Sequence, residues 1–220
     1  MKRRILAGLT LAAILAFAGF GLFKRQSYTD IQAEENWPEQ MQVAELSERQ
    51  ALLDAERLAQ TLPEAPFILR VRVLEDVEFL FGDSRQKVRV EQIYADAGGG
   101  LNVGDEIYLT GQCSLSFVGQ RSLECNFVNL PKIGSEYLIF AGEHLDVPNE
   151  PDLYRLAHVH EFFIAPIFCC EDSPHTIAPT SGPSTNVPYS AVKDNEFFAE
   201  TEAGFQAWYG LKRQLLAAYP

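Results

Sequence analysis

The sequence predicts a mainly β fold with flanking helices (α+β), built as a small barrel or sandwich. Three observations predict it. Apolar and polar residues alternate from Phe67 onward, such runs recur with glycine-containing turns between them, and an apolar stripe at helical spacing returns near the C-terminus. Hydrophobic residues make up 47% of the 220 residues, which is enough to form a real core.

The first 25 residues (1–25) predict a signal peptide or transmembrane anchor. An uncharged apolar run from Ile5 to Phe23 lies between a basic head and Lys24-Arg25. A helix of about 19 residues can just span a bilayer, and the basic head should stay cytoplasmic. Ala16-Phe17-Ala18 is also a small-x-small cleavage signal. We therefore expect a single-pass cell membrane protein with its domain outside the cytoplasm, or a secreted or periplasmic protein cleaved after Ala18.

Residues 26–46 are polar, lack steady periodicity and predict a tether, so that residues 47–220 form the exported domain. Ser47 to Gln50 has the spacing of a helix-capping box. The apolar residues that follow predict a helix that ends near Leu62-Pro63.

The alternation that begins at Phe67 predicts a strand with one face in a core. Gly82-Asp83-Ser84 is predicted as a turn. Further strands are expected at Lys87–Tyr94, Glu106–Thr110, Leu123–Val128 and Glu136–Ala141, with one or two more between residues 153 and 167.

The C-terminal part predicts a long loop and then a helix. Residues 171–192 are rich in proline, serine, threonine and glycine. Asp194 or Asn195 can cap a helix that runs to about Ala218. Its apolar residues recur at helical spacing and should pack on the barrel: Phe197, Phe198, Phe205, Trp208, Leu211, Leu215 and Leu216.

The charge of the chain bears on its partners. Without the first 25 residues, 13 basic residues face 30 acidic ones, a net charge of −17. Such a domain repels phosphate backbones, so we expect no nucleic-acid partner. It favours a cationic or protein surface, and we expect membrane contact only through the N-terminal helix.

The order of these signals resembles the netrin-like domain family, which is related to the tissue inhibitors of metalloproteinases. The resemblance covers roughly residues 65–218, and its best-matching piece is the Gly-Ser-Glu-Tyr-Leu-Ile-Phe-Ala segment from Gly134 to Ala141. It implies an OB-like barrel with flanking helices and a habit of binding other macromolecules. The inhibitors begin their mature chain with a zinc-binding cysteine, whereas no cysteine precedes Cys113 here. The inhibitory mechanism is therefore not carried over.

Four cysteines in an exported chain predict disulfides: Cys113, Cys125, Cys169 and Cys170. A local pattern would join Cys113 to Cys125 across a hairpin. A long-range pattern would join each of them to one of Cys169 and Cys170. The family resemblance implies the long-range pattern, and a disulfide between adjacent cysteines is strained.

A metal site is the alternative use of these residues. His158 and His160 lie on one face of a predicted strand, and Cys169 and Cys170 follow, so two imidazoles and two thiolates could hold zinc. The spacing matches no standard zinc motif, and exposed strand histidines are the ordinary explanation. Apart from possible zinc binding, the sequence predicts no cofactor.

No motif in the sequence specifies a reaction, and no catalytic residue is predicted. The leading hypothesis is an extracytoplasmic, non-catalytic interaction module with a protein partner. Two alternatives remain open: a metal-binding protein or metal-dependent enzyme using His158, His160 and the Cys169-Cys170 loop, and a structural component of the cell envelope.

Overall fold

The computed structural model describes residues 34–80, 83–117, 121–147, 152–157, 164–178 and 186–220, with 14, 17 and 19–21. The chain divides into two compact units, Met1–Trp37 and Pro38–Pro220. The described residues among 14–21 are helical. Within the described ranges, no helix is both long enough and apolar enough to cross a membrane. Most of the predicted anchor at 1–25 lies outside these ranges.

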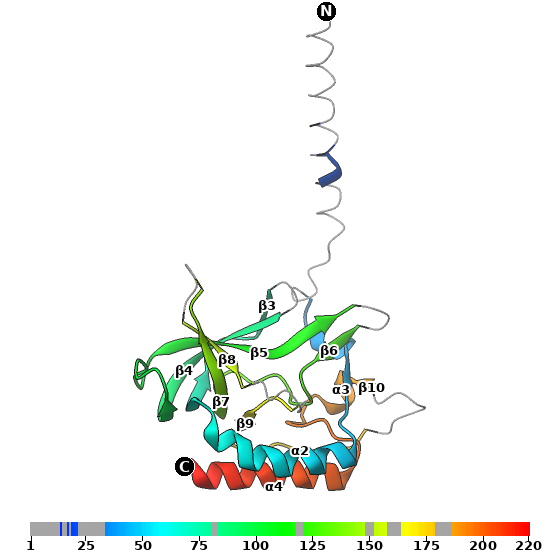
Figure 1. Cartoon of the computed structure of the whole chain (residues 1–220). Coiled ribbons are helices and arrows are strands. Elements are labelled where there is room, and N and C mark those ends of the chain that lie inside the picture. The colour runs from blue at the N-terminus through cyan, green and yellow to red at the C-terminus, as the bar shows by residue number, and fades with distance from the viewer. Residues whose placement is uncertain are drawn as a thin grey trace, which may run out of the picture. The chain divides into compact units, whose positions relative to one another are not determined.

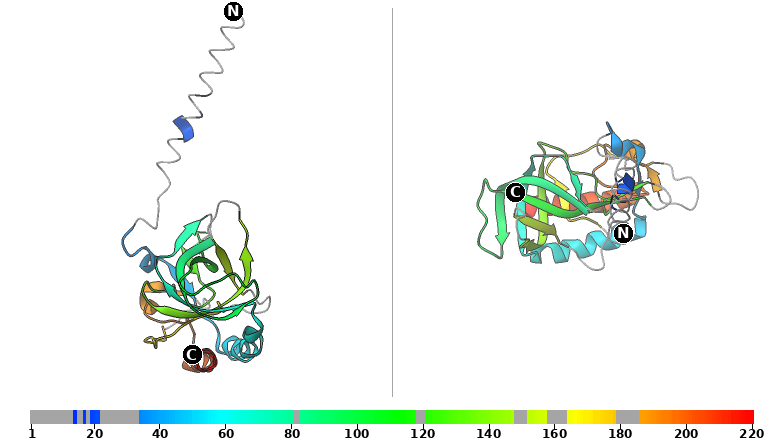
Figure 2. Two further views of the ribbon diagram at one scale, coloured as in Figure 1. Left: turned by 90° about the vertical axis from the view of Figure 1, so that its left-hand side faces the viewer. Right: turned by 90° about the horizontal axis from the view of Figure 1, so that it is seen from above.

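The second unit is built around a closed five-stranded barrel (Figures 1 and 2). Each strand pairs with the next around the ring, and the last pairs again with the first. The mainly β prediction is therefore confirmed. The strands, in order around the barrel, are β2 (Phe67–Val73), β4 (Asp83–Asp96), β5 (Glu106–Ser116), β8 (Leu153–Leu156) and β7 (Glu136–Leu145).

The strand pairing is consistent with the predicted OB-like barrel. Counted along the chain, the five strands pair in the order one, two, three, five, four and back to one. All pairs are antiparallel except β5 with β8, which run parallel. The parallel pair lets the last strand enter the ring between the third and fourth strands, which closes the sheet and leaves it no edge there.

Apolar and polar residues alternate along β2, so that one face of the strand lies in the barrel core and the other faces outward. Leu69, Val71 and Val73 point inward and are at most 1% exposed, while Arg70 and Arg72 between them are partly exposed. Arg72 forms ion pairs on the outer face with Glu91 of β4 and Glu136 of β7. The inward residues remove apolar surface from water, at about 25 cal/mol per Å².

Short strands extend the sheet beyond the barrel. β3 (Glu78–Leu80) pairs with β4, and β9 (Ile167–Cys169) pairs with β7. β6 (Ser122–Glu124) joins β5, and β1 (Gln42–Ala44) lies between β6 and β10 (Asn186–Pro188). Because β1 belongs to the sheet, the folded unit begins before residue 47, inside the predicted tether.

Two helices lie side by side against the barrel (Figure 1). They are α2 (Glu48–Thr61) and α4 (Glu202–Ala218). The Ser47 hydroxyl accepts the Gln50 N–H, which confirms the predicted start of α2. A Cβ on Gly204 would lie 3.4 Å from Ala51 Cβ, so the helices approach closely there. The remaining helical turns are η2 (Trp37–Gln40), η3 (Leu62–Glu64) and α3 (Tyr189–Val192).

The predicted start of the C-terminal helix is wrong. Thr201 caps α4, and the preceding residues are extended. The Phe198 N–H donates to Phe127 O at 2.8 Å, and the Glu200 N–H donates to Leu46 O at 3.1 Å. Phe197 and Phe198 are almost fully buried in this extended segment. Their apolar character fitted the helical pattern of the residues that follow, but both side chains are buried in the core from an extended segment.

Two further boundaries differ from the prediction. The strand expected at Leu123–Val128 ends with Glu124, because Asn126 and Phe127 adopt positive φ values of 48° and 61° that turn the chain. A turn was expected at Gly82-Asp83-Ser84, but Asp83 and Ser84 belong to β4, which begins at Asp83. Ser84 is buried in that strand, and its carbonyl accepts the Thr110 hydroxyl at 2.7 Å.

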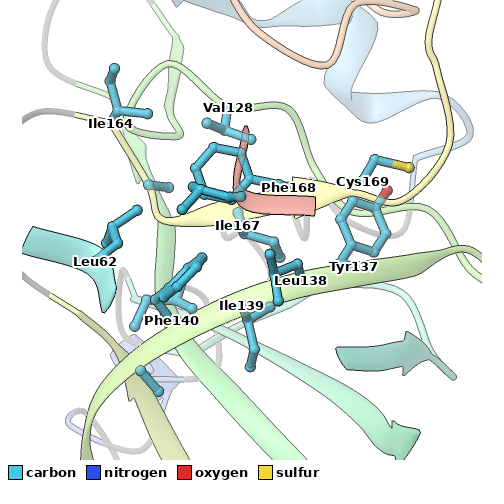
Figure 3. Packing of buried hydrophobic residues seen from close by; sticks show 14 of the residues in the cluster. Leu62, Val128, Tyr137, Leu138, Ile139, Phe140, Ile164, Ile167, Phe168 and Cys169 are labelled. Atoms are coloured by element: carbon cyan, nitrogen blue, oxygen red, sulfur yellow. The ribbon is translucent and has the colours of Figure 1, made fainter. Parts of the chain in front are cut away.

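An aromatic cluster joins α4 to the barrel. Trp208 of α4 is fully buried and stacks on Phe197, with ring centroids 4.8 Å apart, and on Phe168 of β9 at 5.8 Å. Phe168 meets Phe140 of β7 edge to face. Figure 3 shows Phe140 and Phe168 among the core residues that β7 and β9 contribute. The cluster holds β9 and α4 in place, and the candidate site lies beside them.

Candidate functional site

A polar pocket of about 160 Å³ lies where the chain leaves β9. One wall is the segment 129–137, which leads into β7, and a second is the segment 171–174 after β9. Asn195 and Glu196, just before α4, complete the lining. Pockets that gather titratable groups are the first place to look for binding or chemistry.

Tyr137 and Cys169 form the inner end of the pocket. The two residues are partners in the β7–β9 register, and their side chains lie next to each other (Figure 3). The Tyr137 hydroxyl accepts the Lys132 N–H at 2.9 Å and also hydrogen-bonds the Cys169 thiol. Burial, as the main cause, raises the pKa of both groups. Phenol and thiol are therefore both neutral near pH 7.

Glu196 and Lys212 form a buried ion pair behind this end of the pocket. Glu196 Oε2 lies 2.6 Å from Lys212 Nζ, and the two side chains are 7% and 1% exposed. Glu196 Oε1 accepts the Cys169 N–H at 2.7 Å, and Lys212 Nζ also donates to Glu171 O at 2.6 Å. Burial raises the pKa of Glu196 to about 7, while the charge of Lys212 opposes this shift.

These bonds give the ion pair a structural role. They tie α4, through Lys212, to the end of β9 and to the segment that follows it. Tyr209, also on α4, donates its hydroxyl to Asp172 at 2.7 Å and adds a second tie. A buried ion pair contributes little net stability by itself, but loss of one partner leaves an uncompensated buried charge.

The pocket offers binding groups more readily than reactive ones. The Cys169 thiol is protonated, whereas a nucleophilic cysteine needs a lowered pKa. Both carboxylate oxygens of Glu196 are already hydrogen-bonded within the protein. The outer lining carries the exposed acidic residues Glu171 and Asp172 and one basic residue, Lys132. The entrance therefore favours a cationic group.

Of the predicted zinc site, the described residues include only the two cysteines. His158 and His160 lie outside the described residues. Cys169 contacts Tyr137, and the Cys170 N–H donates to Glu136 O at 2.8 Å. Across the described part of the chain, no group of three or more His, Cys, Asp or Glu residues could hold a metal ion. His175 stacks on Phe205 of α4 with ring centroids 3.5 Å apart, and burial lowers its pKa.

The four predicted disulfide cysteines are all free thiols in the structure. Cys113 lies near enough to Cys125 to help raise its pKa, after burial as the main cause, and Cys170 directly follows Cys169. No described contact joins a member of the first pair to a member of the second. The long-range pattern that the family resemblance implied is therefore not the arrangement found, because the β5–β6 hairpin and β9 lie on different parts of the sheet.

Sequence analysis missed Glu196, Lys212 and Tyr137 as site residues. A signal existed for two of them. Lys212 falls on the apolar stripe of the C-terminal helix, four residues after Trp208, and Glu196 directly precedes the apolar Phe197-Phe198 pair. A charged residue inside an apolar pattern is costly unless it is paired, so each predicts a partner of opposite charge. Nothing local identified Tyr137.

The fold and the pocket define a closed β-barrel protein of OB-like topology, with a polar site between a short added strand and the C-terminal helix. No protein-family model and no curated protein sequence matches this chain.

Proposed function

We propose that this protein is an extracytoplasmic, non-catalytic binding module that accepts a cationic group of a protein partner in the pocket beside α4. The observation that carries the proposal is the excess of carboxylates at this pocket. Glu171 and Asp172 are exposed there against one lysine, Lys132, while the third carboxylate, Glu196, is balanced by Lys212.

The charge of the whole domain supports a cationic partner. Residues beyond 25 carry a net charge of −17, which attracts positively charged surfaces over roughly a Debye length, about 8 Å at physiological ionic strength. The pocket adds a specific place for one such charge. Its volume of about 160 Å³ is comparable to the end of a lysine or arginine side chain.

The state of the buried groups supports binding over catalysis. Glu196 keeps α4 in place, and the neutral Cys169 thiol lacks the activation that covalent catalysis needs. Tyr137 has its hydroxyl engaged with the Lys132 amide and the Cys169 thiol. A rigid rear wall with acidic groups at the entrance suits recognition of a charged side chain.

Binding of short peptides tests the pocket directly. We expect an acetylated, amidated Gly-Lys-Gly peptide to shift the NMR amide signals of Ser135 and Tyr137, and the acetyl-lysine version to leave them unchanged. Glu171→Gln with Asp172→Asn should weaken lysine-peptide binding about threefold to tenfold, because each exposed ion pair is worth up to about 1 kcal/mol.

A matched control separates the pocket from the general charge. Glu56→Gln with Glu64→Gln removes two exposed carboxylates from α2 and η3 and should leave peptide binding within about twofold. Equal weakening by both double variants would show that only net charge attracts the peptide, and the proposed pocket would be rejected. Unchanged shifts with the wild-type protein would reject it as well.

The location outside the cytoplasm rests on the apolar run Ile5–Phe23 and its basic flanks. A reporter enzyme that is active only outside the cytoplasm, fused after Pro220, should be active. Its activity should disappear when residues 1–25 are deleted. A fusion that is inactive with the full N-terminus would place the domain in the cytoplasm.

A further inference from the structure

Cys113 and Cys125 lie one residue beyond the last pair of the β5–β6 hairpin, Ser114 with Glu124. In this antiparallel pair, Ser114 faces Glu124 and Ser116 faces Ser122. The same register, extended by one residue, places Cys113 against Cys125. Both cysteines are at most 4% exposed, and the Cys113 thiol, after burial, helps to raise the pKa of Cys125.

The backbone of Cys113 shows which kind of strand position this is. Its N–H donates to Ser84 Oγ of β4 at 2.9 Å, so it points away from β6. In an antiparallel pair, a residue whose amide points away from its partner strand occupies a non-hydrogen-bonded position, where the facing Cα atoms are about 4.5 Å apart. Disulfides join Cα atoms about 4.4–6.8 Å apart, so a position of this kind can carry a disulfide.

A second pocket lies beside Cys125. It has a volume of about 270 Å³, and its lining includes Cys125 and the two residues that follow, Asn126 and Phe127. These two residues have positive φ values, and the bond from the Phe198 N–H to Phe127 O at 2.8 Å holds the turn in place. An oxidant can therefore approach the hairpin from this side.

We propose that Cys113 and Cys125 form a disulfide that fastens β6 to the barrel. The oxidant is the disulfide of a thiol–disulfide oxidoreductase or a small disulfide such as oxidised glutathione. Because burial raises the pKa of the Cys125 thiol, the step begins when one of the two thiols loses its proton to solvent. The resulting thiolate then attacks one sulfur of the donor and releases the other sulfur as a thiolate, which takes up a proton. The second cysteine, as its thiolate, then attacks the mixed disulfide and releases the second donor sulfur. Two electrons and two protons pass to the donor, which leaves as two thiols.

The adjacent cysteines remain reduced in this proposal. Cys169 donates its N–H to Glu196 and Cys170 donates its N–H to Glu136, so both backbone amides are held by the fold. A disulfide between adjacent residues would need a distorted peptide unit between them. The oxidised protein therefore contains one disulfide and two thiols.

The disulfide would stabilise the outer part of the sheet. β6 pairs with β1, and β1 pairs with β10, so these short strands reach the barrel through the β5–β6 hairpin. The inference does not depend on the binding pocket beside α4. Its test uses purified protein and a chemical oxidant, and so its outcome is independent of the cellular location as well.

Mass spectrometry tests the pairing. The full-length protein, equilibrated with oxidised glutathione, is denatured, alkylated without reduction and mapped after proteolysis. We expect an intact mass about two units below that of the tetrathiol chain before alkylation, two alkylated cysteines at 169 and 170, and one linked peptide pair containing Cys113 and Cys125. Four alkylated cysteines, or a link to Cys169 or Cys170, would overturn the proposal.

Variants provide the control. Cys169→Ser with Cys170→Ser should keep the mass deficit, and Cys113→Ser with Cys125→Ser should lose it. If the second variant does not fold, hydrogen exchange of the wild-type protein replaces it. Oxidation should then slow exchange at the Leu123 amide of β6 at least about tenfold, with little change at the α4 amides. An equal effect at both places would contradict a local fastening of β6.

Discussion

Lys212 Nζ lies 2.6 Å from Glu196 Oε2, and both side chains are almost completely buried. Their positions in the chain differ by 16 residues, and one lies before α4 while the other lies on it. The pair therefore fixes the helix to the end of β9 through charges that water cannot screen well.

Lys212→Met tests this relationship. The variant leaves the Glu196 carboxylate buried without its cation, and we expect a loss of about 3–5 kcal/mol in the free energy of unfolding at pH 8. The loss should be smaller at pH 5, because burial already raises the pKa of Glu196 and the carboxyl can become neutral. Urea unfolding at both pH values measures the difference.

The double variant Lys212→Met with Glu196→Gln is the control for that experiment. It removes both charges, keeps an acceptor for the Cys169 N–H and should recover most of the lost stability at pH 8. An equal loss in the single and double variants would mean that packing of the lysine stem, and not its charge, holds α4.

Glu45 predicts a pH dependence of stability. It is 2% exposed, and among the described residues its carboxylate oxygens have no hydrogen-bond partner of normal geometry. Burial first, and the charge of Glu200 second, raise its pKa from 4.5 to about 7. Because the folded-state pKa is the higher one, the group contributes stability below pH 4.5 that is lost as the pH rises through about 7.

Glu45→Gln should therefore stabilise the protein at pH 8 by about 1–3 kcal/mol and have little effect at pH 4. Thermal unfolding from pH 4 to pH 8 measures the change. The exposed Glu56→Gln serves as the control and should show no such pH dependence. A Glu45→Gln variant that is less stable at pH 8 would indicate that the carboxylate has a favourable partner.

Two glycines separate backbone strain from side-chain contact. A Cβ at Gly134 or at Gly210 would meet no atom within 4 Å, but Gly134 has φ +83° and Gly210 lies inside α4. Gly134→Ala should cost about 1–2 kcal/mol in unfolding free energy. Gly210→Ala should add about 0.5–1 kcal/mol. Chemical denaturation of both variants checks the opposite signs, and a stabilising Gly134→Ala would contradict the turn.

The start of α4 can be tested at its cap. Thr201 Oγ1 accepts the Gly204 N–H at 3.2 Å and donates to Glu48 of α2 at 2.9 Å. Thr201→Ala should cost about 1 kcal/mol in unfolding free energy. Asp194→Ala, at the exposed one of the two positions that the sequence offered as the cap, should change stability by less than about 0.5 kcal/mol. A larger effect at Asp194 would restore the longer helix.

The sequence by itself determined the elements whose signals are local. Alternation along Phe67–Val73 and the capping spacing at Ser47 each depend on neighbours within a few residues, and both elements formed where they were expected. The mainly β class followed from several such signals in order, while these signals left a barrel and a sandwich both open. The predicted start of the last helix was wrong because Phe197 and Phe198 pack in the core from an extended segment and do not belong to the helix.

The tertiary structure alone decided which residues meet. Tyr137 and Cys169 become neighbours only because β9 pairs with β7, and Glu196 meets Lys212 only because the extended chain before α4 turns back along the barrel. The sequence left a local and a long-range pairing of Cys113 open, and the β5–β6 register brings it near Cys125. The spacing of apolar residues reflects the repeat of a single strand or helix. Contacts between elements depend instead on the register in which strands pair and on how the sheet closes.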